Sequence, residues 1–428
     1  MSQFIVDRLS FLSALETASK VVASVSYRPI LQSVRLSVDH GFLSVSGTDL
    51  ETAIGAELSC QTADGASLAA LLPLAQALKF AKASEASHVT IEHVRNAIES
   101  RPAMRDSAGK VEAPEIPAKP GLVRLSTNDG ESIELDTEPL EEYPVLPTIA
   151  DSDVSVVLKG ARLRKALERV LPAVAKGAGR YATHGVLIEL QARAAGYVLA
   201  LIGTDGRRLA METLDGIDVP ISADPFVGTK LLQFILPRET AVMLSRMLPK
   251  KEERFVSVRF CTNGEGRPSF SFATNELLSV RILPRALDGE FPRYSAIIPA
   301  RHDSSIVVNS EELLRRLKVV RVSCADDAPC VLLQPAEDVG FATKLVAKAP
   351  GRKSSVELKT ATVSHDPSGR AKNEPKGIEP LGLNPDYLAD GVKACDSEDV
   401  TIAWTRKKNP LTIRAGSFVY VQMPITFE

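Results

Sequence analysis

The feature that most constrains the fold is an internal repeat, in which one order of elements recurs with a period of roughly 150 residues. Each copy begins with an apolar alternating segment that continues into a helical pattern, at residues 4–22, 155–176 and 305–322. In the second copy Leu163, Leu167 and Val170 recur at helical spacing and form one apolar stripe. Such a chain is expected to fold as tandem copies of one small domain.

After this helix, each copy continues with alternating strands. Period-two alternation with turn residues fills residues 34–58, 185–212 and 329–349, which predicts hairpins of a half-buried sheet. The strings GTDL at 47–50 and GTDG at 203–206 occupy the same place in their copies. The turn is therefore part of the repeat.

A second helix and further strands complete each copy. The second helix is predicted at residues 68–83, 230–248 and 384–395. We therefore predict an α+β fold of three tandem domains, each with an antiparallel sheet and two helices. The domains are expected at 1–150, 151–300 and 301–428, and two polar segments, 97–120 and 360–380, are expected to be surface loops.

Composition excludes several classes of protein. The formal net charge is −2, so positive charge for nucleic-acid binding would have to gather on one face. Asp7 and Arg8 interrupt any secretory signal, and the apolar stretch 65–78 is too short to span a membrane. The cysteine number is odd and no pair has CxxC spacing, which favours a reducing cytoplasm over disulfides or zinc; the cysteines are Cys60, Cys261, Cys324, Cys330 and Cys395.

Signatures of catalysis are absent from the sequence. The six histidines have no metal-ligand spacing, and residues 176–180 (KGAGR) lack the frame of a phosphate-binding loop. Asp49 and Asp205 recur in the repeat, but an Asp after Thr is more typical of a carboxylate that accepts backbone N–H bonds in a turn. We predict no enzymatic activity, no cofactor and no metal.

Four strings, in order along the chain, resemble the bacterial sliding clamp family, the beta subunit of DNA polymerase III. They are RPILQSVRLSV (28–38), RYATHGVLIEL with GTDGRRLAM (180–190, 203–211), GEFPRYSAIIP (289–299) and YVQMPI (420–425). The resemblance covers nearly the whole chain apart from the two polar segments. It implies a head-to-tail homodimer whose six similar domains form a ring, with sheets outside and helices lining a channel.

The resemblance also implies the partners and the mechanism. A closed ring cannot leave duplex DNA, so it would hold a weakly bound polymerase at high effective concentration. The implied partners are double-stranded DNA of any sequence, the catalytic subunit of DNA polymerase III, an ATP-driven clamp loader and other proteins with clamp-binding motifs. Two alternatives stay open: a divergent clamp paralogue that binds peptides without closing a ring, and an unrecognised hydrolase on the same repeat.

Basic residues gather on the first helix of several copies and predict a DNA-facing surface. Between Lys159 and Arg180 the only acidic residue is Glu168. A solvated helix face is the alternative for any single helix. The predicted DNA-binding residues are Arg28, Arg162, Arg164, Arg169, Arg180 and Tyr181, of which Arg28, Arg180 and Tyr181 match family positions that contact duplex DNA.

The resemblance implies a second site, where partner peptides insert between the second and third domains. Leu209, Ile297, Val421 and Met423 would form an apolar wall, and Arg208 would pair with an acidic or carbonyl group of the peptide. Thr183 stands where the family has a larger apolar residue, which affects the depth of the pocket. The matching positions are Thr183, Thr204, Gly206, Arg207, Arg208, Leu209, Pro292, Ile297, Pro410, Val421, Met423 and Pro424.

The third predicted site is the contact that closes the ring. Val319, Val320 and Val322 follow the basic part of the third copy's first helix, where the family buries its subunit interface. Val320 and Val322 are the predicted interface residues. The alternative is that one or more of these valines belong to the core of their own domain.

Overall fold

A computed structural model describes residues 2–62, 68–95, 104–105, 111–113, 120–147, 154–177, 179, 181–193, 196–217, 231–250, 254–260, 267–274, 278–335, 343–366 and 378–425. The chain forms two compact units, each discussed by itself below. Unit 1 consists of residues 1–161 and 247–285, and unit 2 of residues 162–246 and 286–428. The element order of the predicted repeat recurs three times, and the middle copy contributes strands to both units. The boundaries 1–150, 151–300 and 301–428 stay a prediction.

The first copy lies wholly in unit 1. Its elements are β1 (Ser2–Asp7), α1 (Arg8–Ala18), β2 (Ser33–Asp39), β3 (Phe42–Thr48), β4 (Thr52–Ser59), β5 (Gln61–Thr62), β6 (Leu68–Pro73), α2 (Leu74–Ala83), β7 (His88–Arg95), β10 (Gly121–Thr127) and β11 (Ser132–Thr137). The predicted loop 97–120 contains two short paired strands, β8 (Met104–Arg105) and β9 (Val111–Ala113), and the rest of it lies outside the described residues.

The second and third copies repeat this order. The second contains β12 (Val154–Lys159), α3 (Gly160–Val170), β13 (Gly185–Arg193), β14 (Gly196–Thr204), β15 (Arg208–Ile217), β16 (Leu231–Pro237), α4 (Arg238–Met247), β17 (Phe255–Phe260), β18 (Ser269–Ala273) and β19 (Leu278–Pro284). The third contains β20 (Ser304–Asn309), α5 (Ser310–Arg321), β21 (Val331–Gln334), β22 (Thr343–Ala349), β23 (Arg352–Leu358), β24 (Thr362–His365), β25 (Leu381–Leu383), α6 (Pro385–Cys395), β26 (Asp399–Trp404), β27 (Leu411–Ala415) and β28 (Phe418–Gln422). The predicted α+β class, with antiparallel sheets and two helices in each copy, is confirmed.

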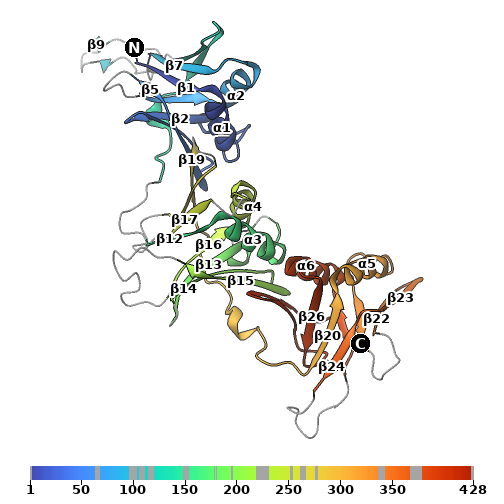
Figure 1. The fold of residues 1–428 in the computed structure, drawn as a ribbon. Helices are drawn as coiled ribbons and strands as arrows, with labels where there is room; N and C mark the ends of the chain where they lie inside the picture. The colour runs from blue at the N-terminus through green and yellow to red at the C-terminus, as the bar shows by residue number, and fades with distance from the viewer. Residues whose placement is uncertain are drawn as a thin grey trace. The chain divides into compact units, whose positions relative to one another are not determined.

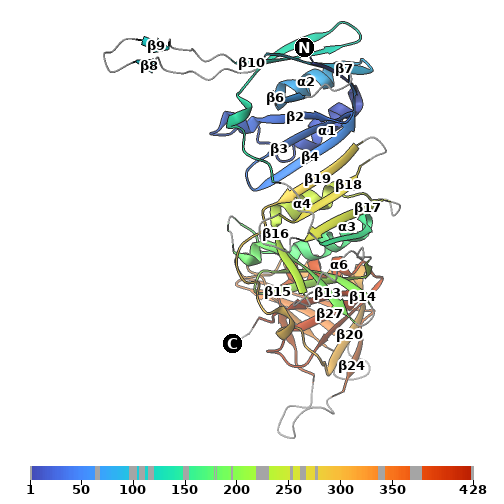
Figure 2. The same ribbon diagram turned by 90° about the vertical axis from the view of Figure 1, so that its left-hand side faces the viewer.

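The two long sheets join strands of successive copies. In unit 1 the order is β12-β17-β18-β19-β4-β3-β2-β6, so β19 of the second copy pairs with β4 of the first. Figure 2 shows the strands from β17 to β6 following one another. In unit 2 the order is β16-β13-β14-β15-β28-β27-β26-β20-β24, so β28 of the third copy pairs with β15 of the second. Figure 1 shows α3, α6 and α5 together on one side of the strands of unit 2.

Two of the predicted second helices begin later than expected. Residues 68–73 form β6, which pairs with β2, and residues 231–237 form β16, which pairs with β13. Each strand ends in a proline, Pro73 or Pro237, and the helix starts at the next residue. The residue before a proline is pushed towards extended backbone. The apolar residues of these segments form strands at the edge of a sheet. The pattern does not separate such a strand from a helix, because short apolar runs suit either structure.

Candidate functional site

The turn between β14 and β15 has the same hydrogen bonds as its counterpart in the first copy. Asp205 Oδ1 accepts from the backbone N–H groups of Arg207 and Arg208, both at 3.0 Å. Asp49 Oδ1 accepts in the same way from Glu51 at 2.9 Å and Thr52 at 2.7 Å. The predicted turn role of both aspartates is confirmed.

The β15–β28 ladder brings this turn against the C-terminal strand. Leu209 faces Val421 across the ladder, and the Met423 backbone N–H donates to the Arg207 carbonyl oxygen at 2.9 Å. Two segments that are more than 200 residues apart in sequence thus form one strip of surface. The structure therefore has the turn and the C-terminal strand side by side, as expected for the peptide pocket.

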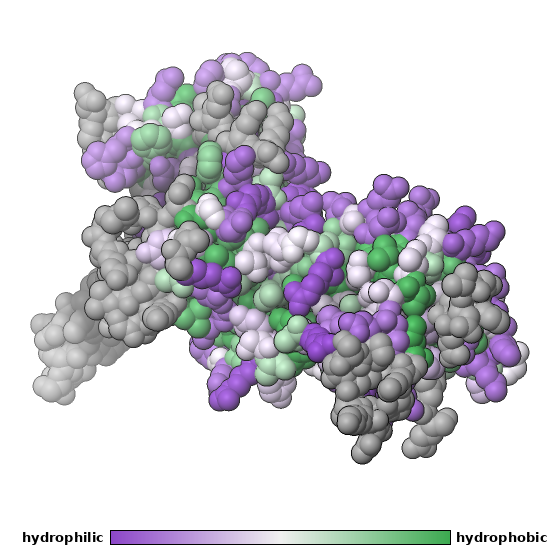
Figure 3. Space-filling view, turned by 60° about the horizontal axis from the view of Figure 1, so that its bottom comes forward, coloured by the Kyte–Doolittle hydropathy of each residue, from purple (hydrophilic) through white to green (hydrophobic). Residues whose placement is uncertain are grey.

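An apolar area, named here the apolar platform, extends from this strip. A buried floor underlies partly buried hydrophobic residues contributed by β15, a 3-10 turn and the segment that leads into the third copy. The floor is Leu187, Ala200, Ile202, Leu209, Ile235, Val419 and Val421, and the upper layer is Ala182, Met211, Leu287, Phe291, Tyr294 and Ile298. Figure 3 shows hydrophobic residues reaching the surface in patches bordered by hydrophilic ones. A cluster of partly buried hydrophobic side chains over a buried floor, as in the platform, is typical of a docking surface.

A buried carboxylate anchors the upper layer of the platform. The Tyr294 hydroxyl donates to Glu189 Oε2 at 2.6 Å, and Gln191 Nε2 donates to the same oxygen at 2.9 Å. Burial of the phenol and its bond to Glu189 raise the pKa of Tyr294 above the usual range. Glu189 itself is 5% exposed. The carboxylate therefore fixes the segment 290–298 against β13, a role that the sequence did not reveal.

The role of Arg208 as a peptide contact stays a prediction, and within the chain its guanidinium already has two acidic partners. Its side chain is 4% exposed, and it pairs with Asp205 at 3.0 Å and with Asp390 at 2.8 Å. The guanidinium carbon lies 4.0 Å from the centre of the Tyr387 ring. Burial lowers the pKa of Arg208, but interactions with Tyr420, Asp390 and Asp205 outweigh that effect, so the group stays charged.

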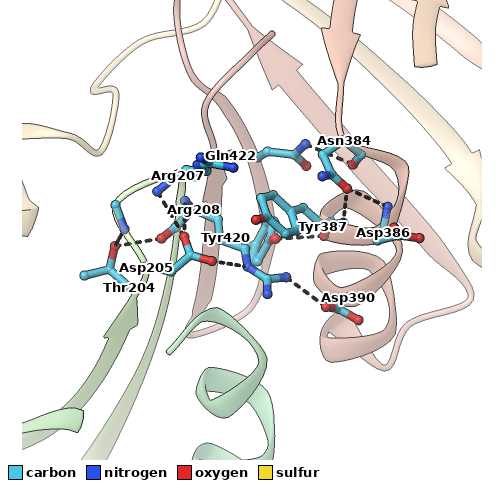
Figure 4. A network of polar contacts seen from close by, with 11 residues as sticks. Thr204, Asp205, Arg207, Arg208, Asn384, Asp386, Tyr387, Asp390, Tyr420 and Gln422 are labelled. Atoms are coloured by element: carbon cyan, nitrogen blue, oxygen red, sulfur yellow. Dashed lines mark hydrogen bonds and ion pairs between the residues drawn. The ribbon is translucent and has the colours of Figure 1, made fainter. Parts of the chain in front are cut away.

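Figure 4 shows that this arginine links the turn to α6 and β28. The Tyr420 hydroxyl donates to the Tyr387 carbonyl at 2.7 Å, and Gln422 Nε2 donates to the Asn384 carbonyl at 3.1 Å. We name the cluster Asp205, Arg208, Tyr387, Asp390 and Tyr420 the arginine latch. Asp390 and Tyr387 were missed because no spacing in the sequence connects them to residue 208.

The other predicted pocket residues differ in exposure. Met423 is 41% exposed and Ile297 38%, so both can meet a ligand. Thr204 is buried and supports the turn, because its Oγ1 donates to the Arg208 carbonyl at 2.7 Å and accepts from Gly206. Gly206 has φ +83°, a conformation that favours glycine. Pro292 and Arg207 are exposed, and Thr183, Pro410 and Pro424 are half-buried.

Five of the six predicted DNA-binding residues fall into three groups. Arg28 is exposed and Tyr181 is 75% exposed. Arg162 pairs with Asp215 at 3.0 Å and Arg164 with Glu168 at 2.9 Å, in partly exposed ion pairs. Arg180 lies outside the described residues.

Arg169, also predicted to bind DNA, is held by contacts within the chain. It pairs with Glu212 at 2.8 Å, with side chains only 15% and 5% exposed, and donates to the Cys395 carbonyl at 3.2 Å. Its guanidinium also lies over the Phe418 ring, 5.4 Å from the centre. The residue therefore joins the second and third copies within unit 2, and its charge is already compensated.

Several exposed basic residues have no ion pair or side-chain hydrogen bond among the described residues. They lie on or beside helices and are Lys20, Arg28, Lys79, Lys176, Arg246, Arg315, Lys318 and Lys393. These are the cations that are free to meet phosphates. Of these residues, only Arg28 is among the predicted DNA-binding residues, because a charge count along the sequence does not show which basic residues have acidic partners.

The predicted ring-contact residues also need a correction. Val320 is fully buried in the core of the third copy, so it cannot contact another subunit. Val322 is 73% exposed and Val319 50% exposed. The helix phase explains the error, because neighbouring positions point to different faces of α5.

The described residues offer no sign of metal or membrane chemistry. Within the described ranges no group of three or more His, Cys, Asp or Glu side chains is placed to hold a metal ion. No helix in that part of the chain is long and apolar enough to cross a bilayer. Cys60, Cys324, Cys330 and Cys395 are free thiols, and Cys261 lies outside the described residues.

Comparison with known proteins identifies relatives of the whole chain. Residues 2–147 match the family described as DNA polymerase III beta subunit, N-terminal domain. The beta sliding clamp of Vibrio cholerae is 23% identical over 431 residues, covering 99% of both chains, and that of Haemophilus influenzae is 27% identical over 315 residues, covering 73% of this chain and 72% of its own. The crystal structure of the DNA polymerase III subunit beta from Pseudomonas aeruginosa superposes with a TM-score of 0.77 at 19% identity, covering 99% of this chain and 100% of that one.

Proposed function

We propose that the chain is a bacterial sliding clamp, and that two copies close head to tail around duplex DNA and hold partner proteins there through the apolar platform. The proposal includes no catalytic step. The observation that carries it is the way in which successive copies of the repeat join. Strand β19 of the second copy pairs with β4 of the first, and β28 of the third pairs with β15 of the second.

The same rule predicts the contact that closes the ring. In the series β4, β15, the equivalent strand of the third copy is β23, and in the series β19, β28 the equivalent strand of the first copy is β11. Both β23 and β11 are edge strands of their sheets. An unpaired edge invites another strand, and a ring that pairs β23 of one subunit with β11 of the next leaves neither edge open.

The register can be carried over as well. Thr52 faces Pro284 in the β4–β19 ladder. The hairpins place Arg352 at the position of Thr52 and Thr137 at that of Pro284. Val356 then faces Ile133 of the other subunit, and Lys353 faces Asp136. An apolar pair and an opposite-charge pair are both favourable cross-strand neighbours.

The exposed basic residues without ion pairs support the proposal that DNA lies inside such a ring. Salt-dependent phosphate contacts without base readout let a protein slide along the duplex. The proposed DNA-facing residues are Arg28 and Tyr181, with Arg162 and Arg164 available through exchange of their surface ion pairs, and Arg180 is proposed from the sequence alone. To these we add Lys79, Lys176, Arg246 and Lys393, and we leave out Arg169 because of its buried pair with Glu212.

Charge reversal tests this DNA surface. Changing Lys176, Arg246 and Lys393 together to Glu should weaken retention on circular DNA and lower the salt dependence by about one unit of slope for each phosphate that the variant no longer neutralises. Retention would be followed by filter assays on circular and linear DNA over a range of salt concentrations. The matched control changes Lys348, Arg259 and Arg193, which lie on strands, to Glu; equal weakening in the control would contradict a specific DNA face.

Peptide binding tests the platform. Met423→Ala removes a 41% exposed apolar side chain beside the turn and should weaken a clamp-binding peptide about tenfold. Fluorescence anisotropy with a labelled peptide measures the change, and light scattering should show an unchanged dimer. Val25→Ala, at an 85% exposed valine elsewhere, is the control. Full affinity in Met423→Ala would place the peptide elsewhere.

The partner proteins are part of the same proposal. The DNA polymerase III catalytic subunit, a clamp loader and other proteins with clamp-binding motifs would share the platform, and a cytoplasmic location is proposed with them. The adaptor alternative predicts peptide binding by a monomer, so solution mass separates it from the ring.

A further inference from the structure

In unit 1, a pocket occupies the position that corresponds to the apolar platform of unit 2. It is a cavity of about 380 Å³ lined by β3, β4 and β19, together with Leu146 and Pro147 of the segment that follows the first copy. The platform in unit 2 has the same parts, since it is built on β14, β15 and β28 beneath residues 287–298. Both places are junctions where a strand of the next copy joins the sheet.

The register of the β4–β19 and β15–β28 ladders shows which residues of the pocket correspond to which residues of the platform. Ala53 faces Leu283 in the first junction, and Leu209 faces Val421 in the second. Two residues further along, Gly55 faces Arg281, and Met211 faces Val419. The identical hydrogen bonds of the turns at Asp49 and Asp205 confirm this alignment.

Positions that are apolar in the platform of unit 2 carry small, polar or charged residues in the pocket of unit 1. Ser46 stands at the position of Ile202, Gly55 at that of Met211, and Arg281 at that of Val419. Loss of the large side chains leaves the hollow, and the remaining side chains are polar or charged. An apolar peptide anchor would lose its partners here, because buried apolar contact is what rewards such an anchor. The pocket must suit a different ligand.

Two opposite charges define what the pocket can bind. Arg281 and Glu57 are both exposed, and their side chains have no ion pair or hydrogen bond among the described residues. Glu57 faces Ser279, so Arg281 is its diagonal neighbour on the same face, at a spacing of about 7–8 Å. Side chains two residues apart in an extended chain are separated by about 6.6–6.8 Å and also share a face.

We propose that this pocket binds an extended peptide segment with an acidic residue and, two positions away, a basic residue. The acidic side chain pairs with Arg281 and the basic one with Glu57, and the backbone between them passes over Leu283 beside Leu146. The hydroxyls of Ser44 and Ser46 bond the segment's backbone. This inference rests on the repeat and the pocket, and is independent of ring closure and DNA binding.

The test uses the full-length protein and the tripeptide acetyl-Glu-Ala-Lys-amide. Methyl NMR should show shifts at Leu146 and Leu283 with a Kd of about 1 mM, and the neutral acetyl-Gln-Ala-Gln-amide should bind at least about tenfold more weakly. Arg281→Gln should weaken the charged tripeptide about tenfold. Arg259→Gln, on the same face of the sheet but outside the pocket, should leave its affinity unchanged.

A variant that fills the pocket distinguishes binding in the pocket from nonspecific binding elsewhere on the surface. Gly55→Met restores the residue of the apolar platform, and an added Cβ at Gly55 meets only Ser46 Oγ at 3.5 Å, an ordinary contact. Binding should be lost in this variant. The proposal is overturned if Gly55→Met binds the tripeptide as the parent does, if the neutral tripeptide binds equally well, or if no shift appears up to about 20 mM ligand. An unchanged affinity in Arg281→Gln would overturn it too, since Arg281 would then be paired with Glu57.

Discussion

Ile133→Asp is expected to convert the proposed dimer into monomers. Ile133 lies on the edge strand β11, and the carried-over register places it against Val356 of the other subunit. An unpaired carboxylate in an apolar interface costs about 2–5 kcal/mol, and the ring contains two such contacts, so the dimer constant should weaken by at least about a thousandfold. Light scattering over a concentration series gives the mass, and retention on circular DNA should fall to that of a protein that cannot encircle it.

A compensating change makes this result specific. Adding Val356→Lys to Ile133→Asp creates an opposite-charge pair across the contact and should restore part of the dimer. Both positions are only partly buried on edge strands, so the subunit should keep its fold. Val25→Asp, at an 85% exposed site, carries the same charge and should remain a dimer. If Ile133→Asp is still a dimer at nanomolar concentration, β11 is not part of the contact.

Arg208→Met is expected to destabilise unit 2 and to abolish peptide binding with it. The substitution leaves Asp205 and Asp390 without their cation, and their side chains are only 16% and 33% exposed. Breaking a buried ion pair on one side costs about 3–5 kcal/mol, because the remaining charge stays desolvated. The urea midpoint for unit 2 should fall, while Arg207→Met, at the exposed neighbouring position, should change it little.

Further variants separate the contribution of the charge of Arg208 from that of its planar guanidinium geometry. Arg208→Lys keeps the charge but loses the planar fork that reaches both carboxylates, so it should recover only part of the stability. Adding Asp390→Asn to Arg208→Met removes one unpaired charge and should raise the midpoint again. If Arg208→Met retained full stability but lost peptide affinity, Arg208 would contact the peptide directly, as the family resemblance first suggested.

The sequence by itself determined the repeat, and with it most of the fold. Period-two and helical patterns predicted the α+β class, and the recurring Thr-Asp pair located equivalent turns in two copies. The family resemblance placed Leu209 and Val421 in one apolar wall, and the structure has them opposite each other in a ladder. These predictions succeeded because they depend on local alternation and turn chemistry, which are written in neighbouring residues.

Side-chain roles that depend on distant residues were decided by the tertiary structure alone. A basic run does not show that Arg169 meets Glu212, or that Arg208 meets Asp390 on α6. A row of valines does not show that Val320 points into the core while Val319 and Val322 face outwards. The polar pocket at Arg281 became visible only when ladder register aligned two junctions. In each case a side chain's role depends on which residues the fold brings opposite it, and burial makes those partners decisive because an unpaired charge is costly there.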